Sequence, residues 1–358
     1  MNIFAPTQSR TTEAYDKQGY VHLSGGVDPE FLAYCNAFLD AAMAERRALD
    51  NFAFKSKKEQ YLFEFPEGMD IEQALMRPVS ELTGLDLSRL TLCERHIKVY
   101  TEDASELPPP HKDRLASEVA MAVPLSVPAE SRLALYPEAC QKVNPYNTTA
   151  EWKQHMPEPE TPEQVLRNYQ PTLLDIRPGD IAMFPGSSVF HERLKPAHTR
   201  ILYLKMNALG LDGLGEDPRT AHRLKASQLL EESTDDADLR RLTVDLSPRL
   251  EQLTVGHSRD SWQALYYAHI GAEGARPLRR CDFLLLKSLQ GPQAVELLLA
   301  QARRSEAEML RRVRRLAREG LLLLAPPAQA APASASGSAG AKAAAAPRDA
   351  DAKKPLAA

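Results

Sequence analysis

The chain has 358 residues, enough for one large domain and a smaller one or for two domains of ordinary size. Its 44 basic and 48 acidic side chains nearly balance, so no overall field points to nucleic acid or to a membrane surface. The cysteines at 35, 93, 140 and 281 form no CxxC pair, and no apolar run approaches the ~20 residues that cross a bilayer, so we expect a cytoplasmic protein without disulfides.

The first part of the chain predicts helices and then strands. Residues 28–47 carry apolar side chains at helical spacing behind an Asp-Pro-Glu cap, which predicts a helix that covers the back of a sheet. A short helix is predicted at 80–90, and strands are predicted at 91–100, 116–127 and 131–136.

The strand predicted at 91–100 has one polar side, formed by His96, Lys98 and Tyr100. We interpret His96 as a structural histidine. Lys98 is either a residue that binds an acid or a solvated lysine on an edge strand, and the sequence does not decide between the two.

The segment Pro-Pro-Pro-His-Lys-Asp-Arg places His111 and Asp113 two residues apart. Side chains of an extended segment repeat with a period of two, so both point to one face and both can bind one cation. An imidazole and a carboxylate, completed by a second histidine, form the facial set that holds non-heme Fe(II) and leaves positions open for reaction. Because His-x-Asp alone is common by chance, the prediction depends on a second segment.

The second segment begins with a predicted hairpin, whose strands at 173–176 and 181–184 are joined by a Pro-Gly-Asp turn. His191 is predicted on the next strand and is the candidate second histidine. After a chain reversal, Arg200 begins a strand rich in Ile, Leu and Tyr. A guanidinium on the strand beside the histidine is suited to bidentate capture of a carboxylate.

Together the two segments contain His-x-Asp, a long gap, and then a histidine with an arginine nine residues later. This order resembles the Fe(II)/2-oxoglutarate-dependent dioxygenases, and among them the phytanoyl-CoA dioxygenase-like group. Residues 15–23 resemble the group's opening, in which a helix ends at a glycine before a strand. Residues 175–184 resemble its Pro-Gly-Asp hairpin before the distal histidine. The resemblance covers roughly residues 11–210.

The resemblance implies a mainly β catalytic domain at 1–215, a double-stranded β-helix (jelly roll, cupin-like) flanked by helices. Its implied Fe(II) ligands are His111, Asp113 and His191. It further implies that 2-oxoglutarate is the co-substrate and that Arg200 binds its distal carboxylate, with Lys98 as a second candidate. With O2, the enzyme hydroxylates an unactivated C–H bond of a small organic substrate (amino acid, acyl or specialised metabolite) and releases succinate and CO2. Because Asp113 is present, hydroxylation or desaturation is favoured over halogenation.

Residues 138–171 form a long polar connection that contains Trp152, His155 and Tyr169. Long ordered loops often cover active sites, so we expect a lid, with a surface excursion as the alternative. The stretch after Tyr136 departs from the Pro-Gly-Ser-His turn that is frequent in the resembling group, so the group's substrate contacts do not carry over.

The predicted structure becomes helical from about residue 215. Helices are expected at 221–232, 236–242, 261–270, 278–290, 292–301 and 305–318, before a short apolar strand at 321–324. The last three helices and the strand resemble a winged-helix module, so we predict a helical, winged-helix-like domain at 216–325. The Ala/Pro-rich residues 326–358 are predicted to form a disordered tail.

Five arginines crowd the last predicted helix, at positions 311, 312, 314, 315 and 318. They either contact an anionic partner or form a solvated face opposite Met309, Val313 and Leu316, and the solvated face is the interpretation that we favour.

Other classes of function stay open. The C-terminal part also suits a hydroxylase whose substrate is a peptide or is bound to a carrier protein. Alternatively, the chain is a non-catalytic cupin-like binding module, or a 2-oxoglutarate-sensing regulator that binds DNA. The near-neutral charge speaks against nucleic acid as a partner, and we expect a small molecule and no membrane.

Overall fold

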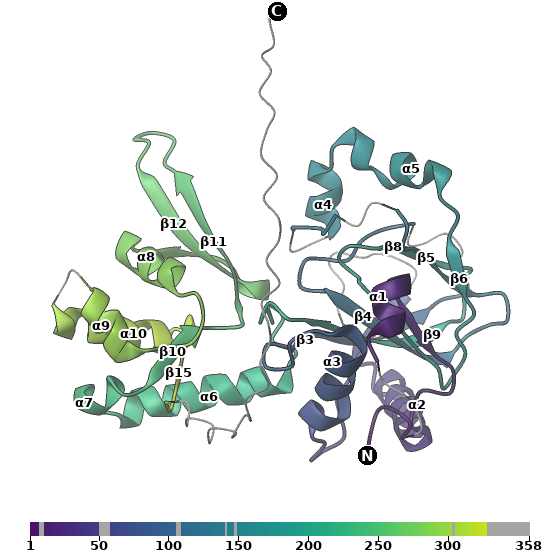
Figure 1. Cartoon of the computed structure of the whole chain (residues 1–358), viewed down its shortest axis with the longest axis horizontal. Helices are drawn as coiled ribbons and strands as arrows, with labels where there is room; N and C mark the ends of the chain where they lie inside the picture. Colours follow the sequence, from purple (N-terminus) through teal and green to yellow (C-terminus); the bar gives the residue numbers. More distant parts are fainter. Residues whose placement is uncertain are drawn as a thin grey trace, which may run out of the picture.

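The computed structural model describes residues 1–6, 11–49, 58–104, 109–139, 142–146, 149–302 and 305–327. The N-terminal part is a sandwich of two antiparallel sheets, shown at the right of Figure 1. The larger sheet has the strand order β1 (Val21–Leu23), β7 (Ile181–Phe184), β4 (Val119–Ser126), β9 (Arg200–Asn207), β3 (Thr91–Tyr100) and β2 (Lys58–Leu62). The smaller sheet has the order β6 (Thr172–Leu174), β5 (Arg132–Tyr136) and β8 (Phe190–Leu194).

The chain passes back and forth between the two sheets from β4 to β9, as in a jelly roll. The prediction of a mainly β fold with helices is confirmed at this level. β2 was not predicted from the sequence.

The larger sheet has two distinct faces, because side chains along a strand alternate. On β9, Leu202 and Leu204 point outward into the largest apolar core. Ile201 and Tyr203 point inward, toward the smaller sheet. On β9, even-numbered side chains therefore point to the outer face and odd-numbered side chains to the inner face.

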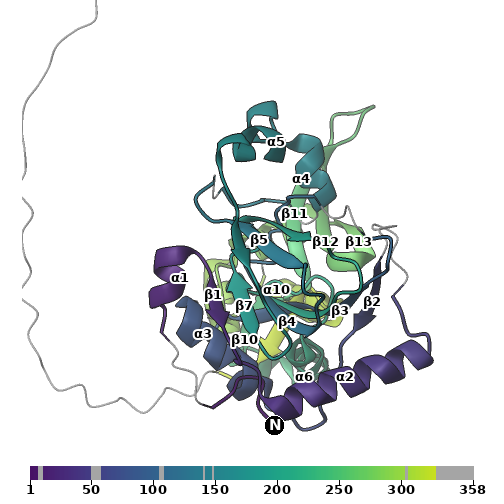
Figure 2. The same ribbon diagram turned by 90° about the vertical axis from the view of Figure 1, so that its right-hand side faces the viewer.

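Helices cover the outer face of the larger sheet (Figure 2). α2 (Pro29–Ala44) begins as predicted at Asp28, whose side chain accepts a hydrogen bond from the backbone N–H of Glu30 at 2.9 Å. The other helices on this side are α1 (Glu13–Gln18) and α3 (Arg77–Thr83), which follows a π-helical turn at Glu72–Met76. The helix predicted at 80–90 ends earlier, because Gly84 takes the left-handed conformation with φ 72° and stops α3.

Most of the described residues between 138 and 171 lie against the outer face of the smaller sheet. Their short helices are α4 (Thr149–His155), α5 (Pro162–Val165) and two 3-10 turns at Glu158–Glu160 and Leu166–Asn168. The Trp152 ring packs against Phe190 with 5.7 Å between ring centroids. Because Phe190 and His191 are neighbours on β8, their side chains point to opposite faces. Trp152 and the residues packed with it therefore lie behind the smaller sheet, as in the surface-excursion alternative, whereas Asn144 Nδ2 donates to the carbonyl of Asp113 at 2.8 Å.

The C-terminal part begins with α6 (Pro218–Ser233) and has an apolar core of its own, drawn from residues 239–324. Its other elements are α7 (Asp236–Leu239), β10 (Thr243–Leu246), β11 (Leu250–His257), β12 (Ala264–Ile270), β13 (Gly274–Leu278), α8 (Arg280–Ser288), β14 (Gln293–Ala294), α9 (Val295–Gln301), α10 (Glu306–Arg318) and β15 (Leu322–Ala325). The strands form two sheets, in the orders β14-β10-β15 and β11-β12-β13. The boundary predicted at 215/216 and the winged-helix likeness remain predictions.

The helix predicted at 261–270 is wrong, because β12 occupies most of it. β12 pairs with β11 from Leu250↔Ile270 to His257↔Ala264, and the two strands form the hairpin that stands up at the left of Figure 1. The apolar spacing of residues 261–270 suggests a helix, but this stretch forms a strand because it pairs with β11, which precedes it in the chain.

The solvated face predicted for α10 is also wrong for most of its arginines. Arg312 is only 9% exposed, and its Nε lies 3.2 Å from the fully buried carboxylate of Asp282. The side chains of Arg314, Arg315 and Arg318 also lie within 4.0 Å of acidic groups. The basic helix is therefore largely neutralised within its own part of the chain.

Residues 328–358, most of the predicted tail, lie outside the described part of the chain. Among the described residues, no helix combines the length and apolar character that spanning a membrane requires.

Candidate metal centre

The structure brings the three predicted ligands together at the inner face of the smaller sheet. His111 and His191 form an isolated antiparallel bridge, with each backbone N–H donating to the carbonyl of the other residue at 3.0 Å. The backbone N–H of Asp113 donates to the carbonyl of Gly186 at 2.8 Å. One potential ligand atom from each of the three side chains lies within 4.8 Å of the other two.

Both imidazoles are oriented by the backbone. His111 Nδ1 lies 2.9 Å from the carbonyl of Pro109, and His191 Nδ1 lies 3.0 Å from the carbonyl of Val189. A carbonyl only accepts hydrogen bonds, so each Nδ1 carries the proton and each Nε2 keeps a free lone pair. This is how protein backbones usually fix a histidine that binds a metal.

The two oxygens of Asp113 have different surroundings. Oδ1 accepts a hydrogen bond from Lys205 Nζ at 2.8 Å. Oδ2 is buried without a hydrogen-bond partner among the described residues, and it lies 3.7 Å from His191 Nε2. An unsatisfied buried carboxylate oxygen is costly, so Oδ2 needs a ligand.

The protonation of the three side chains suits metal binding. Burial, followed by the neighbouring His191, holds the pKa of His111 well below its ordinary value, and burial also lowers the pKa of His191. Burial alone raises the pKa of Asp113, but Lys205, His191 and His111 together outweigh burial, and the pKa falls to about 2. At neutral pH the centre therefore offers two neutral imidazoles and one carboxylate. Two nitrogens and one oxygen within 4.8 Å of one another suit a divalent ion such as Fe(II).

The three ligands line a cavity between the two sheets that is rich in cations. Lys98, Arg193 and Lys205 also line it. Arg193 lies two residues after His191 on β8, so both side chains point to the same face. Arg193 is only 5% exposed, and none of its three guanidinium nitrogens has a hydrogen-bond partner among the residues that the structure describes.

Arg200, which the sequence predicts as the carboxylate-binding residue, does not line this cavity. It has the same parity on β9 as Leu202 and Leu204, so it points to the outer face of the larger sheet. There its side chain is 40% exposed and its Nη1 lies 3.9 Å from Asp40 Oδ1 of α2. The structure therefore corrects the expectation for Arg200, because a side chain on the outer face does not reach a ligand between the sheets.

Lys98 lies on the side of β3 that lines the cavity, which is one of the two positions that the sequence leaves open. Its Nζ lies 3.2 Å from Glu94 Oε1. Burial alone lowers the pKa of Lys98, but the nearby acidic groups, Glu94 first and then Asp113, together outweigh burial and raise the pKa. Lys98 is therefore a buried, charged lysine that already has an acidic partner.

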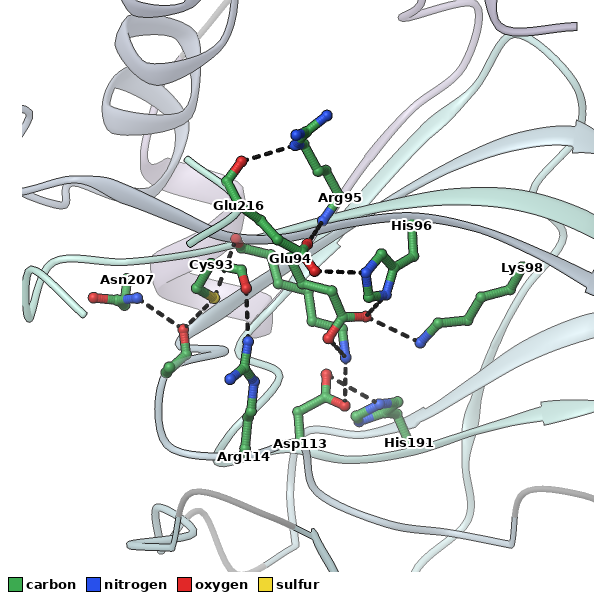
Figure 3. A network of polar contacts seen from close by, with 12 residues as sticks. Cys93, Glu94, Arg95, His96, Lys98, Asp113, Arg114, His191, Asn207 and Glu216 are labelled. Carbon is green, nitrogen blue, oxygen red and sulfur yellow. Dashed lines mark hydrogen bonds and ion pairs between the residues drawn. The ribbon is translucent and has the colours of Figure 1, made fainter. Parts of the chain in front are cut away.

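Figure 3 shows that the acidic partner of Lys98 belongs to a longer network. The Nδ1 atom of His96 lies 3.6 Å from Glu94, and its Nε2 lies 2.8 Å from Glu216, just before α6. His96 is not in the His111–Asp113–His191 group, which agrees with its interpretation as a structural histidine. The network links the cavity to the point where the C-terminal part begins.

Sequence reasoning missed Arg193 and Lys205. The signal for Arg193 was present, because His191-Glu192-Arg193 has the same alternation as His111-Lys112-Asp113. Lys205 had no local signal, since its closeness to Asp113 depends on which face of β9 turns inward.

No known protein family and no curated protein sequence matches the chain. Solved structures with a similar fold include the 2-oxoglutarate-dependent carbocyclase SnoK of nogalamycin biosynthesis, with 13% identity, a TM-score of 0.44, and coverage of 57% of this chain and 86% of that one. A prolyl-4-hydroxylase from Pseudomonas putida has 12% identity, a TM-score of 0.38, and coverage of 55% and 95%. HygX from Streptomyces hygroscopicus, with nickel and 2-oxoglutarate bound, has 12% identity, a TM-score of 0.36, and coverage of 56% and 87%. Because these TM-scores lie below 0.5, the likeness to these structures does not by itself assign a function to the chain.

Proposed function

We propose that the chain is an Fe(II)- and 2-oxoglutarate-dependent oxygenase that hydroxylates a C–H bond of a small organic substrate. His111, Asp113 and His191 hold the metal. The observation that carries this proposal is a cavity lined both by these three residues and by Arg193, whose guanidinium has no hydrogen-bond partner in the described part of the chain. A metal site with positions left open beside a buried cation suits a co-substrate that is both a chelator and an acid.

Each residue has a definable task in this proposal. The two imidazoles and Asp113 Oδ2 would hold the ion, and three protein ligands would leave positions on it for the co-substrate and O2. Arg193 replaces Arg200 as the residue that binds the distal carboxylate of 2-oxoglutarate, because its guanidinium lies inside the cavity and has no hydrogen-bond partner among the described residues. Iron held by these residues would supply the oxidising power together with 2-oxoglutarate and O2, with succinate and CO2 as the products of the co-substrate.

The first test is binding without turnover. Anaerobic addition of Fe(II) and 2-oxoglutarate to the purified chain should give a visible metal-to-ligand absorption band, and His111→Ala should abolish it. In air, release of succinate should rise when the true substrate is added. A wild-type chain that binds neither Fe(II) nor 2-oxoglutarate contradicts the proposal and favours the non-catalytic module.

The second test compares two arginines on opposite faces of the same sandwich. Arg193→Met should raise the 2-oxoglutarate concentration needed for half-maximal turnover by at least about tenfold, since a charge-assisted pair contributes on the order of 1.5–3 kcal/mol. Arg200→Met is the matched control and should leave that concentration unchanged, because Arg200 contacts Asp40 on the outer face. The reverse result restores the original expectation for Arg200.

The narrower predictions from the sequence belong to the same proposal. Phytanoyl-CoA dioxygenase-like membership, a specialised metabolite as substrate and a cytoplasmic location remain predictions, as does the alternative of a peptide or carrier-bound substrate. The DNA-binding alternative loses support, because α10 presents few unpaired charges. Arg312 and Arg315 share Asp282, and Arg318 pairs with Glu231.

A further inference from the structure

The carboxylate of Asp113 has one engaged oxygen and one unpartnered oxygen. Lys205 Nζ lies 2.8 Å from Oδ1, while Oδ2 has no hydrogen-bond partner in the described chain and faces His191 Nε2. A free carboxylate binds a metal through one oxygen or through both. Here the two oxygens are no longer equivalent, because a lysine already binds one of them.

Lys205 is held firmly in this position. It stands in the middle of the eight-residue strand β9, on the inner face, and its side chain is only 8% exposed. A second acid, Glu94, lies 3.4 Å from Nζ through its Oε2. Burial favours neutral Glu94, yet Lys205 and then Lys98 hold the pKa of Glu94 well below its ordinary value. The ammonium group thus lies between two carboxylates and has little freedom to leave Asp113.

We propose that Lys205 is a positioning residue that restricts Asp113 to one-oxygen ligation of the metal. The inference rests on the proposed metal centre. One-oxygen binding leaves three of six positions open on the ion, whereas two-oxygen binding leaves two. A co-substrate that chelates through two atoms, together with O2, needs all three. Lys205 therefore contributes to function through Asp113, without touching the reacting atoms.

The chain offers a matched control in Lys98. Lys98 also lines the cavity and also pairs with Glu94, at 3.2 Å. Figure 3 shows it joined to Glu94 and not to Asp113. Replacing either lysine by methionine removes one positive charge from the same cavity. Only Lys205→Met removes the hydrogen bond to an oxygen of Asp113. A difference between the two variants would therefore reflect the positioning of Asp113 and not merely the loss of a positive charge from the cavity.

The experiment uses Co(II) as a spectroscopic probe of the full-length chain. Wild type and Lys98→Met should show the same Co(II) absorption spectrum, and Lys205→Met should show a changed one. Lys205→Met should also weaken 2-oxoglutarate binding to the Co(II) form by about tenfold more than Lys98→Met does, the size typical of groups that orient a metal ligand. Lys205→Arg keeps a donor for Oδ1 and should restore both readouts at least in part.

The outcomes distinguish this inference from the proposed function. If wild type binds Co(II) but Lys205→Met retains the spectrum and the 2-oxoglutarate affinity of Lys98→Met, the positioning role is overturned and the metal centre stands. If wild type binds no Co(II), both fall. Should Lys205→Met not fold, a crystal structure of the wild-type chain with Mn(II) decides, because the inference requires Oδ2 on the metal and Oδ1 on Lys205. Both oxygens on the metal would overturn it.

Discussion

Gly186 provides the strictest test of the site's geometry. Its backbone carbonyl accepts from the N–H of Asp113 at 2.8 Å. A methyl group at this position would lie 2.8 Å from Asp113 Oδ2, 2.8 Å from the carbonyl oxygen of Ser117 and 3.1 Å from Ala120 Cβ. Two of these contacts are shorter than real Cβ atoms show, and one neighbour is backbone. In Gly186→Ala, the part that is free to move is therefore the Asp113 carboxylate.

The required movement can be worked out. Reaching ordinary contact at 3.4 Å from 2.8 Å takes about 0.6 Å. Metal–ligand distances tolerate only about ±0.2 Å, so we expect Gly186→Ala to weaken Mn(II) or Co(II) binding by about 10- to 100-fold, or about 1.4–2.7 kcal/mol. Isothermal titration with Mn(II) measures this. Gly256→Ala on β11 is the control, since its nearest contact is an ordinary 3.6 Å to Tyr267. Wild-type metal affinity in a folded Gly186→Ala chain would refute the assigned position of Oδ2.

Three further predictions concern the ligands, pH and the C-terminal core. Asp113→Ala should fold, because Lys205 keeps Glu94 as a partner, yet bind no Fe(II) and turn over no 2-oxoglutarate; normal succinate release would contradict its role. Burial keeps the pKa values of His111 and His191 low in the folded state. As the pH falls below about 6.5, these histidines are therefore protonated in the unfolded chain but remain neutral in the folded one, which favours unfolding. The melting temperature of the metal-free protein should thus fall between pH 7 and about 5.5, and the fall should be smaller in His111→Gln; equal falls would refute the cause. Arg312→Met removes one of the two arginines that pair with buried Asp282 and should destabilise the protein by about 1.5 kcal/mol in urea unfolding, because Arg315 still lies 2.6 Å from that carboxylate, whereas the exposed Arg311→Ala should change stability by less than about 0.5 kcal/mol.

The metal centre was predictable because its signal is local. The period of two along an extended segment assigns His111 and Asp113 to one face without any knowledge of the fold. His191 was assigned from the order and spacing of the two segments, which resemble a known family, and β8 is the predicted strand that carries it. A side-chain pattern that spans only three residues can thus be recognised from the sequence without the fold.

The face of β9 was not readable, and this explains the wrong expectation for Arg200. The turn before β9 contains Lys195 and His198 with φ values of 47° and 61°, so it takes left-handed backbone without a glycine to reveal it. The register of a strand is fixed by its partners, here β3 and β4, and a slip of one residue exchanges the two faces. The observed register of β9 places Lys205 on the inner face beside Asp113 and Arg200 on the outer face beside Asp40.

The pairing of charges inside the cavity explains why Arg193, rather than Lys98, is the better candidate for a co-substrate carboxylate. Lys98 is already matched by Glu94, and Lys205 by Glu94 and Asp113. Arg193 has no hydrogen-bond partner in the described chain although it is nearly fully buried, and a buried charge without a partner is strongly unfavourable. A carboxylate that arrives beside Arg193 satisfies it, whereas at Lys98 it must compete with Glu94. The affinity for 2-oxoglutarate should therefore fall further in Arg193→Met than in Lys98→Met, and the opposite order, measured by titration of the Co(II) form, would assign the carboxylate to Lys98.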